Sequence, residues 1–339
     1  MASEPEPHVV ELFASLGISA ADIPSDIQGR IELASDAVIA KDDRYSTRDI
    51  AERFGRDPEE LCVVFAEIGI RVFDVDDILF SEEDLGLLGF VTAAAEHLLI
   101  DNEGDEILNV IGSAIETVAE AAVASHVQGP ERRLETDTDG IHLNKQMAEL
   151  GLDLGGILPM VFRHHLRQAA LRQRRVQNHD HRELVEMSVG FVDLVGFTSL
   201  SQSLASKDLV DFVRDFERAA HNAARRHNTR IAKLIGDEVM FVAESATDAA
   251  GFATDLITTF RTENVVPRGG IAQGSIITLH GDYFGPIVNL AARLVGEAVP
   301  AEVLVTKPVA SELDGHATAA GRRMLKGFPD PVEVWSVAT

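Results

Sequence analysis

The sequence FVDLVGFTSL, residues 191–200, runs from an apolar strand through a carboxylate and a glycine into a polar helix start. Asp193 stands where the strand ends, a position from which a carboxylate can hold a divalent cation. The turn at Gly196 leads into Phe197 and Thr198, and backbone amides at a helix N-terminus bind phosphate groups. An aspartate at a strand end is more often a cap, so this stretch alone leaves a structural role open.

A second acidic turn follows in KLIGDEVMF, residues 233–241. Its strands are predicted to form a hairpin closed by Gly236 and Asp237, and Gly-Asp pairs are also common in purely structural turns. If the hairpin neighbours the strand that ends at Asp193, the two aspartates can share two divalent ions. That arrangement activates a hydroxyl and stabilises a leaving pyrophosphate.

The third motif is GDYFGPIVNLAAR, residues 281–293. Asn289 and Arg293 are four residues apart, so on a helix they share one face. Together they can steady a ribose and the charge that develops on a phosphorus atom. A solvent-facing arginine beside a capping asparagine is the structural alternative.

Strand and helix patterns alternate over residues 185–339, which predicts an α+β domain with helices over a mixed sheet. The predicted strands are Val185–Asp193, Arg230–Leu234, Glu238–Val242, Gly269–Ile277, Glu302–Thr306 and Val332–Val337. The predicted helices are Lys207–His227, Thr247–Thr262, Ile287–Gly296 and Lys307–Leu313.

In this order and at these separations, the three motifs resemble the catalytic domain of class III nucleotidyl cyclases. The resemblance covers residues 185–339 and implies a ferredoxin-like mixed sheet with flanking helices. It also implies an adenylate cyclase, a phosphorus–oxygen lyase that forms cyclic AMP and pyrophosphate from ATP. Asp193 and Asp237 match the metal-binding aspartates of the family, which hold two divalent cations per site, Mg²⁺ or Mn²⁺.

The resemblance also assigns the substrate-binding residues. Lys233 matches the lysine that reads the purine ring, and Asp282 matches its acidic partner. An aspartate accepts a hydrogen bond from the exocyclic amine of adenine, whereas the carbonyl of guanine would leave it unpaired. Asn289 and Arg293 match the pair that acts on the transition state. Phe197 and Thr198 lie in the loop that faces the triphosphate, and Arg268 is expected to be a phosphate or structural partner rather than a catalyst.

In this family the metal-binding aspartates meet the other four residues across a head-to-tail dimer interface. Because one chain carries all six, a symmetric homodimer would build two complete sites. One departure is FGPIVN at residues 284–289, where relatives often have an aromatic-Gly-Asn/Asp-Thr-Val-Asn run. A proline fits the first turn of a helix, so we expect intact function, with the shape of this loop left in doubt.

Three other enzymatic or binding roles are weighed against this one. A guanylate cyclase is disfavoured by Lys233 and Asp282. A diguanylate cyclase has a related hairpin, which IGDE at residues 235–238 faintly resembles, but that family lacks the Asn-x-x-x-Arg helix. A catalytically inactive nucleotide sensor is disfavoured because all six key positions are filled.

Residues 1–158 are predicted to form an all-helical domain. The signals include the helix start at Ser25-Asp26, two short helices around Gly55 and a helix start at Ser81–Asp84. The predicted segments are helices Thr47–Phe54, Pro58–Ile68, 85–100, 104–125 and 143–152, a loop at Gly129–Gly140 and a break at Gly155-Gly156. The helix–turn–helix-like run at Thr47–Gly55 is interpreted as a packed helical pair, because acidic residues stand where a DNA-reading helix needs basic ones.

The net charge of −25 is concentrated in this first half. Residues 1–160 hold 34 acidic and 10 basic side chains, which argues against a nucleic-acid partner. Residues 159–184 form a basic linker, predicted to be a solvated helix that docks on the acidic half rather than an RNA-binding arm. Cys62 is the only cysteine, so no disulfide can form within the chain. With no secretory signal and no transmembrane segment in view, a cytoplasmic location is expected.

The first half also resembles the regulatory domain of actinobacterial adenylate cyclases. The resemblance rests on its helical pattern, on FSEEDL (residues 80–85) and on the basic linker. Some of these respond to pH, and histidine is the side chain that titrates near neutrality. The histidines before and within the linker are His97, His126, His142, His164, His165, His179 and His181. The hypothesis is that the first half inhibits the catalytic domain and that acidification changes how the linker docks. Ordinary surface or core histidines are the alternative.

Overall fold

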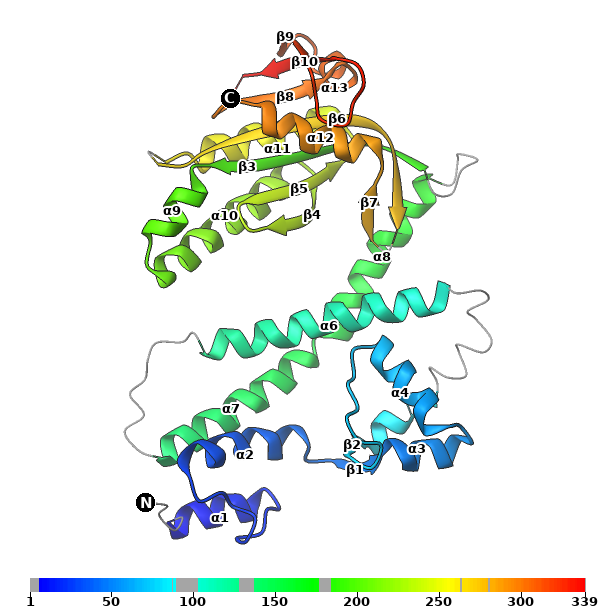
Figure 1. The fold of residues 1–339 in the computed structure, drawn as a ribbon, viewed down its shortest axis with the longest axis vertical. Coiled ribbons are helices and arrows are strands. Elements are labelled where there is room, and N and C mark those ends of the chain that lie inside the picture. The colour runs from blue at the N-terminus through cyan, green and yellow to red at the C-terminus, as the bar shows by residue number, and fades with distance from the viewer. Residues whose placement is uncertain are drawn as a thin grey trace. The chain divides into compact units, whose positions relative to one another are not determined.

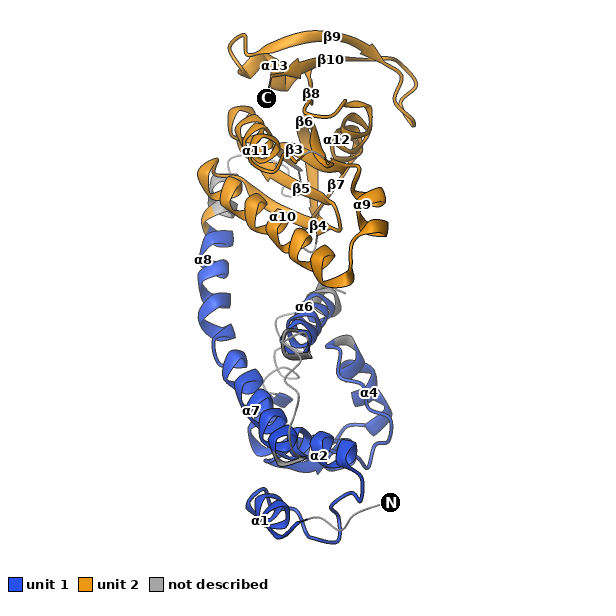
Figure 2. Cartoon of the chain, turned by 90° about the vertical axis from the view of Figure 1, so that its left-hand side faces the viewer, with its two compact units in different colours: residues 1–170 blue, residues 171–339 orange. Residues whose placement is uncertain are grey.

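The computed structural model describes residues 6–86, 88–89, 103–127, 137–176, 184–262, 264–279 and 281–338. The chain divides into two compact units, residues 1–170 and 171–339 (Figure 2). The division falls within helix α8 (Leu158–Val176), inside the segment predicted to be a basic linker. Among the described helices, none combines the length and the apolar character that crossing a bilayer requires.

The first unit consists of helices and one short two-stranded ribbon (Figure 1). Its helices are α1 (Pro7–Ser15), α2 (Ile27–Ile39), α3 (Thr47–Phe54), α4 (Pro58–Glu67), α6 (Glu103–Val127), α7 (Asp137–Gly155) and α8. Strands β1 (Asp43–Ser46) and β2 (Ile78–Ser81) pair antiparallel. The ribbon corrects the prediction of an all-helical domain. Each strand has only four residues, too few for an alternating pattern to stand out, and the partners are far apart in sequence.

Several helix ends in this unit follow from local capping. The Asp26 side chain accepts a hydrogen bond from the Gly29 amide (2.8 Å), so α2 begins where the sequence predicts. Ser46 and Asp49 form a reciprocal capping box at the start of α3. Gly55 ends α3 in the left-handed conformation (φ 64°), which confirms the two short helices predicted around it.

The later helices confirm some predictions and correct one. The helix predicted at 104–125 is α6, and the predicted break lies between the end of α7 at Gly155 and the start of α8. Because α7 begins at Asp137, the loop predicted up to Gly140 is wrong in its last residues. Residues 129–136 and most of the helix predicted at 85–100 lie outside the described residues.

Two small apolar cores hold the first unit. One joins α3, α4 and the ribbon through Ile50, Phe65 and Phe80. The other joins α1, α2 and α7, where Phe13 and Ile141 are fully buried.

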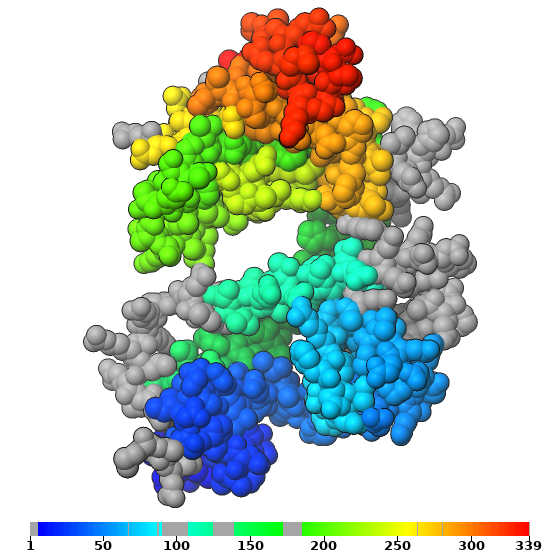
Figure 3. Space-filling model, viewed as in Figure 1, coloured from blue at the N-terminus to red at the C-terminus, as the bar shows by residue number. Residues whose placement is uncertain are grey.

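The second unit is built on an eight-stranded mixed sheet with the order β4-β5-β3-β6-β8-β10-β9, and β7 adds to β6 (Figure 1). The strands are β3 (Leu184–Val195), β4 (Arg230–Ile235), β5 (Glu238–Ala243), β6 (Val266–Leu279), β7 (Asp282–Phe284), β8 (Val303–Thr306), β9 (Ala317–Arg323) and β10 (Val332–Val337). The pair β6–β8 is parallel and the other pairs are antiparallel. In the space-filling view, the red C-terminal strands lie together at one end of this unit (Figure 3).

Helices cover both faces of the sheet. The helices are α9 (Phe197–Ser203), α10 (Ser206–Arg226), α11 (Ala246–Thr259), α12 (Pro286–Glu297) and α13 (Lys307–Glu312). On one face α10, α11 and α13 enclose a core with Phe216, Phe241 and Phe252. On the other face α12 packs over a second core through Ala291 and Leu294. The predicted strands and helices of this unit are all present, with ends within about three residues.

Two strands of this unit were not predicted. Strand β7 has only three residues, and β9 has the sequence ATAAGRR, whose side chains are small or charged. Strand β7 contains two aromatic residues but is too short for a strand pattern to stand out, and β9 has one β-branched residue and no aromatic one. Both form because they pair with long neighbours, β7 with β6 and β9 with β10.

One ion pair fastens α10 to α11. Arg226 Nε donates to Asp255 Oδ2 (2.7 Å), and His227 Nε2 lies 3.1 Å from the same oxygen. The hydrogen bond from Arg226 lowers the pKa of Asp255 below its ordinary value of 3.8, against the opposing effect of burial. A carboxyl with a lowered pKa stabilises the fold above its unfolded pKa, and that stability is lost as the pH falls through the folded pKa.

We therefore expect Asp255→Asn to reduce the free energy of unfolding by about 1 kcal/mol at pH 7. In urea titrations, this difference from the wild type should begin to shrink below pH 3.8, where the unfolded wild-type chain takes up a proton at Asp255, and should vanish once the pH falls below the lowered pKa of the folded state. An equal loss at pH 7 and at pH 3 would contradict the assigned role of the charge.

Candidate active site

The two predicted metal-binding aspartates come together at one end of β3. Asp193 lies opposite Glu238 on β5 and opposite Arg268 on β6. The Leu194 amide donates to the Asp237 carbonyl (3.2 Å), which ties the tip of the β4–β5 hairpin to β3. The hairpin therefore neighbours the strand that carries Asp193, which is the condition under which the two aspartates can meet.

The carboxyl groups at this end of the sheet interact electrostatically. Burial raises the pKa of Asp237, and the charge of Asp193 raises it further, although a hydrogen bond to its own backbone amide opposes the change. Burial also raises the pKa of Glu238, with added repulsion from Asp193 and Asp237. Sequence reasoning did not single out Glu238 as a site residue, since its place beside Asp193 depends on strand register.

Arg268 holds the Asp193 side chain in place. Its Nε and Nη2 both donate to Asp193 Oδ2, at 3.0 and 2.9 Å. Its Nη1 donates to the carbonyl oxygens of Gly296 and Ala298, at 3.0 and 3.2 Å, at the C-terminal end of α12. Arg268 therefore has the structural part of the role expected for it, linking β3, β6 and α12. Both bonds to Asp193 end on one oxygen, so among these contacts Oδ1 is left for an ion.

The predicted phosphate-binding turn is shaped by Gly196. Its φ is 96°, and a Cβ there would lie 2.6 Å from the Asn264 carbonyl oxygen, so a side chain cannot be accommodated. Phe197 packs on Phe212 with ring centroids 6.0 Å apart, whereas Thr198 is exposed. What Phe197 can offer a triphosphate is therefore its backbone amide.

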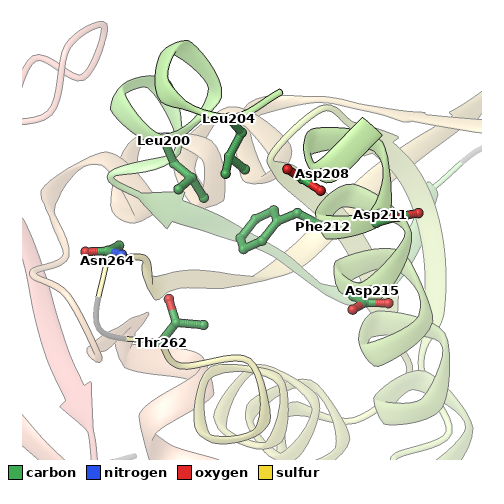
Figure 4. Close-up of a pocket in the computed structure, with 8 residues that line it drawn as sticks. All are labelled: Leu200, Leu204, Asp208, Asp211, Phe212, Asp215, Thr262 and Asn264. Carbon is green, nitrogen blue, oxygen red and sulfur yellow. The ribbon is translucent and has the colours of Figure 1, made fainter. Parts of the chain in front are cut away.

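A groove of about 350 Å³ lies beside this turn, between α9 and α10 (Figure 4). Leu200, Leu204 and Phe212 form its apolar part, and Asp208, Asp211 and Asp215 lie along α10. None of the predicted site residues lines this groove, and its acidic side chains would repel a triphosphate. We therefore do not assign the nucleotide to it.

The predicted base-reading pair is formed within one chain. Lys233 Nζ on β4 donates to Asp282 Oδ2 on β7 at 2.5 Å. The Tyr283 amide donates to the other oxygen, Asp282 Oδ1, at 2.8 Å. The carboxylate is thus held in a fixed orientation, and its side chain is only 24% exposed. A positioned donor beside a positioned acceptor is suited to reading the edge of a base.

The two predicted transition-state residues lie on α12. Asn289 and Arg293 are both exposed, and they are four residues apart on the helix. The buried residues of α12 are Ala291, Leu294 and Val295, so the helix packs on the sheet while the polar pair stays accessible. Pro286 occupies the first turn of α12, as expected, and does not interrupt it.

No group of three histidine, cysteine or carboxylate side chains among the described residues is arranged to hold a metal ion. Asp193 and Asp237 can supply only part of the six oxygen ligands that Mg²⁺ requires. Mg²⁺ commonly completes its coordination with substrate phosphates and water, so two half-buried carboxylates beside a phosphate-binding turn fit such an ion.

Comparisons with known proteins identify relatives of this chain. Residues 179–338 match the family model described as the adenylate and guanylate cyclase catalytic domain. An uncharacterized protein of Mycobacterium tuberculosis is 32% identical, over 85% of this chain and 78% of its own length. An adenylate cyclase of Streptomyces coelicolor is 32% identical, over 78% and 68%. A pH-sensitive adenylate cyclase of M. tuberculosis is 28% identical, over 90% and 81%.

The chain therefore belongs to the class III adenylate and guanylate cyclase family, with adenylate cyclases among its relatives. The predictions of a cyclase fold for the second unit and of an enzyme of this class are confirmed. The roles of the individual site residues remain predictions, since the comparisons concern whole chains and domains.

Proposed function

We propose that this chain converts ATP into 3′,5′-cyclic AMP and pyrophosphate. The single observation that carries the proposal is the contact between Lys233 and Asp282, at 2.5 Å. Lys233 offers a proton to a ring nitrogen, and Asp282 accepts one from the exocyclic amine of adenine. Guanine presents a carbonyl at that position and would leave the carboxylate without a donor, which favours ATP over GTP as substrate.

In the proposed reaction, the ribose 3′ oxygen attacks the α-phosphorus in line with the departing pyrophosphate. Asp193 and Asp237 would hold two divalent cations, Mg²⁺ or Mn²⁺, which supply Lewis-acid stabilisation of the attacking and leaving oxygens. Arg293 would neutralise charge that develops on the phosphoryl group, and Asn289 would orient the ribose. The amides of the turn after Gly196 would bind phosphate oxygens at the start of α9.

We also propose that the active form is a head-to-tail homodimer with two shared sites. Within one chain, two sets of site residues make separate contacts. Asp193 and Asp237 belong to one set, and Lys233 and Asp282 belong to the other. Apolar side chains on the strands near Lys233 and Asp282 are unusually exposed: Ile235, Ile277, Leu279 and Phe284, at 53%, 40%, 48% and 45%. An exposed apolar patch of this kind favours burial against a second chain.

For the first unit we propose a regulatory role, with autoinhibition that depends on pH. The alignment with the pH-sensitive mycobacterial relative extends over 90% of this chain and so includes much of this unit. His142, His164 and His165 are exposed on α7 and α8, where a change of charge can alter docking. The side chains of His97, His126, His179 and His181 lie outside the described residues. A constant ratio of full-length to isolated 185–339 activity from pH 5.5 to 8 would contradict this role.

The enzymatic proposal is tested with the purified full chain, Mn²⁺ and either ATP or GTP, with chromatographic detection of the cyclic product. We expect cyclic AMP from ATP, a much slower reaction with GTP, and loss of both on adding EDTA. Asp193→Asn, which keeps the shape of the side chain, should be inactive. Preferential cyclisation of GTP would establish a guanylate cyclase instead. Binding of ATP without any cyclic product would establish a nucleotide sensor.

A further inference from the structure

Two side-chain contacts join β4 to β7, although these strands are not neighbours in the sheet. Strand β4 pairs with β5, and β7 pairs with β6. Besides the bond between Lys233 and Asp282, the guanidinium carbon of Arg230 lies 4.9 Å from the centre of the Tyr283 ring. This distance is typical of a cation–π interaction. Two adjacent bridges thus join the strands: Arg230 contacts Tyr283, and Lys233 contacts Asp282.

An irregularity in β4 makes the second bridge possible. Residues three apart on a regular strand point to opposite faces. Between Ile231 and Lys233 the register against β5 shifts, which inserts one extra residue into β4. Arg230 then lies opposite Val242, and Lys233 lies opposite Met240.

The side chains of Arg230 and Lys233 therefore project from the same face of β4. Val242 and Met240 belong to the core beneath α12, and directly opposed residues of an antiparallel pair share a face. Tyr283 belongs to the same core. Without the bulge, the side chains of Arg230 and Lys233 would project from opposite faces of β4. Only one of them could then reach β7 from the face that α12 covers.

Tyr283 also controls the orientation of its neighbour Asp282. The amide of Tyr283 donates to Asp282 Oδ1, the residue is only 3% exposed, and the guanidinium group of Arg230 lies over its ring. The ring and this amide belong to one residue, so the contact with Arg230 helps to hold in place the residue whose amide orients the carboxylate. Because β7 has only three residues and pairs with one strand, the bridge from β4 adds to the support that it receives from β6 and α12.

We propose that Arg230 and Tyr283 are positioning residues for adenine recognition: their contact sets the separation and orientation of Lys233 and Asp282. This inference rests on the base-reading role proposed for those two residues. Arg230 and Tyr283 themselves do not touch the base. Their effect is expected in the binding of ATP and in its preference over GTP, and not in the chemical step.

The test compares Arg230→Met and Tyr283→Leu with the wild type in steady-state kinetics with Mn²⁺-ATP and Mn²⁺-GTP. We expect the KM for ATP to rise about threefold, in line with the strength of an exposed cation–π contact. The kcat should stay within about twofold, and the preference for ATP, as a ratio of kcat/KM values, should fall about threefold. The double variant should be little worse than either single variant, because both remove the same contact.

Two control variants separate positioning from folding. Tyr283→Phe keeps the aromatic face and removes a buried hydroxyl that has no hydrogen-bond partner among the described residues, so its kinetics should match the wild type. Arg225→Met removes an exposed arginine of α10 and should change neither the KM nor the preference. Thermal melting of each variant verifies that the fold is retained.

The outcomes distinguish this inference from the function on which it rests. If Lys233→Met leaves the preference for ATP unchanged, the proposed base-reading role itself fails. If Lys233→Met abolishes the preference while folded Arg230→Met retains the wild-type KM and preference, only the positioning inference is overturned. A fall in kcat with an unchanged KM would likewise overturn it.

Discussion

An equimolar mixture of Asp193→Ala and Asn289→Ala chains is expected to recover about a quarter of wild-type activity, although each variant alone is almost inactive. Loss of Asn289 removes the group that we propose acts on the transition state, an effect of roughly 10²–10³-fold. Loss of Asp193 removes a proposed metal ligand and should be at least as severe. In random assembly, half of the dimers combine the two variants, and each such dimer contains one intact site out of two.

A second mixture serves as the control for this experiment. A chain that carries both substitutions, mixed with an equal amount of wild type, places a defect in both sites of every mixed dimer. The wild-type chains should then show about half the activity that they have alone. If each site were built from one chain, the first mixture would recover nothing and the second would lose nothing. That result would overturn the shared-site dimer while leaving the reaction itself untouched.

Replacing Asp282 with asparagine should relax the choice of base by about 100-fold. A carboxylate only accepts hydrogen bonds, whereas an amide can turn its oxygen to the amine of adenine or its NH₂ group to the carbonyl of guanine. The asparagine could then form a hydrogen bond with either base. Guanine would no longer leave the side chain at position 282 without a partner, so the preference for adenine would be lost. We expect kcat/KM to fall for ATP and to rise for GTP, which a competition assay with both nucleotides measures directly.

The matched control is Asp330→Asn, which makes the same chemical change at an exposed position outside the site. It should leave both nucleotides unaffected. If Asp282→Asn slows ATP and GTP equally, Asp282 supports the local structure and does not read the base. The melting temperature then discriminates between the two roles, because a purely structural residue would lower it in proportion to the loss of activity.

The catalytic half was largely predictable because its motifs are local. Asp193 and Asp237 each stand at a turn that follows an apolar strand, and Asn289 and Arg293 are spaced for one helix face. The residues that make up each signal lie close together in the chain, so the signal can be recognised in the sequence without knowledge of the fold. The pairing of Lys233 with Asp282, 49 residues apart, came from resemblance to a family and is found in the structure.

Contacts that depend on register were not predictable. Arg268 was expected near a phosphate or in a structural role, but its two bonds to Asp193 require β3 and β6 to pair at one particular offset. Glu238 and Tyr283 acquire their surroundings in the same way. The extra residue in β4 cannot be read from RIAKLI, because nothing in those side chains marks a bulge.

The first unit shows the same difference between local signals, which are predictable, and long-range pairing, which is not. The cap signal at Asp26 predicted the start of α2, since a cap is an interaction within three or four residues. The ribbon of β1 and β2 escaped notice because its strands are short and separated by more than 30 residues.

For this protein, the order of residues determined the identity of the helices and long strands, the acidic turns and the family to which they belong. The tertiary structure decided which carboxylate Arg268 holds, which carboxyls repel each other and how β4 reaches β7. The physical reason is distance along the chain. Periodicity and capping act between near neighbours, whereas ion pairs and charge repulsion follow distances in space that only strand pairing and packing establish.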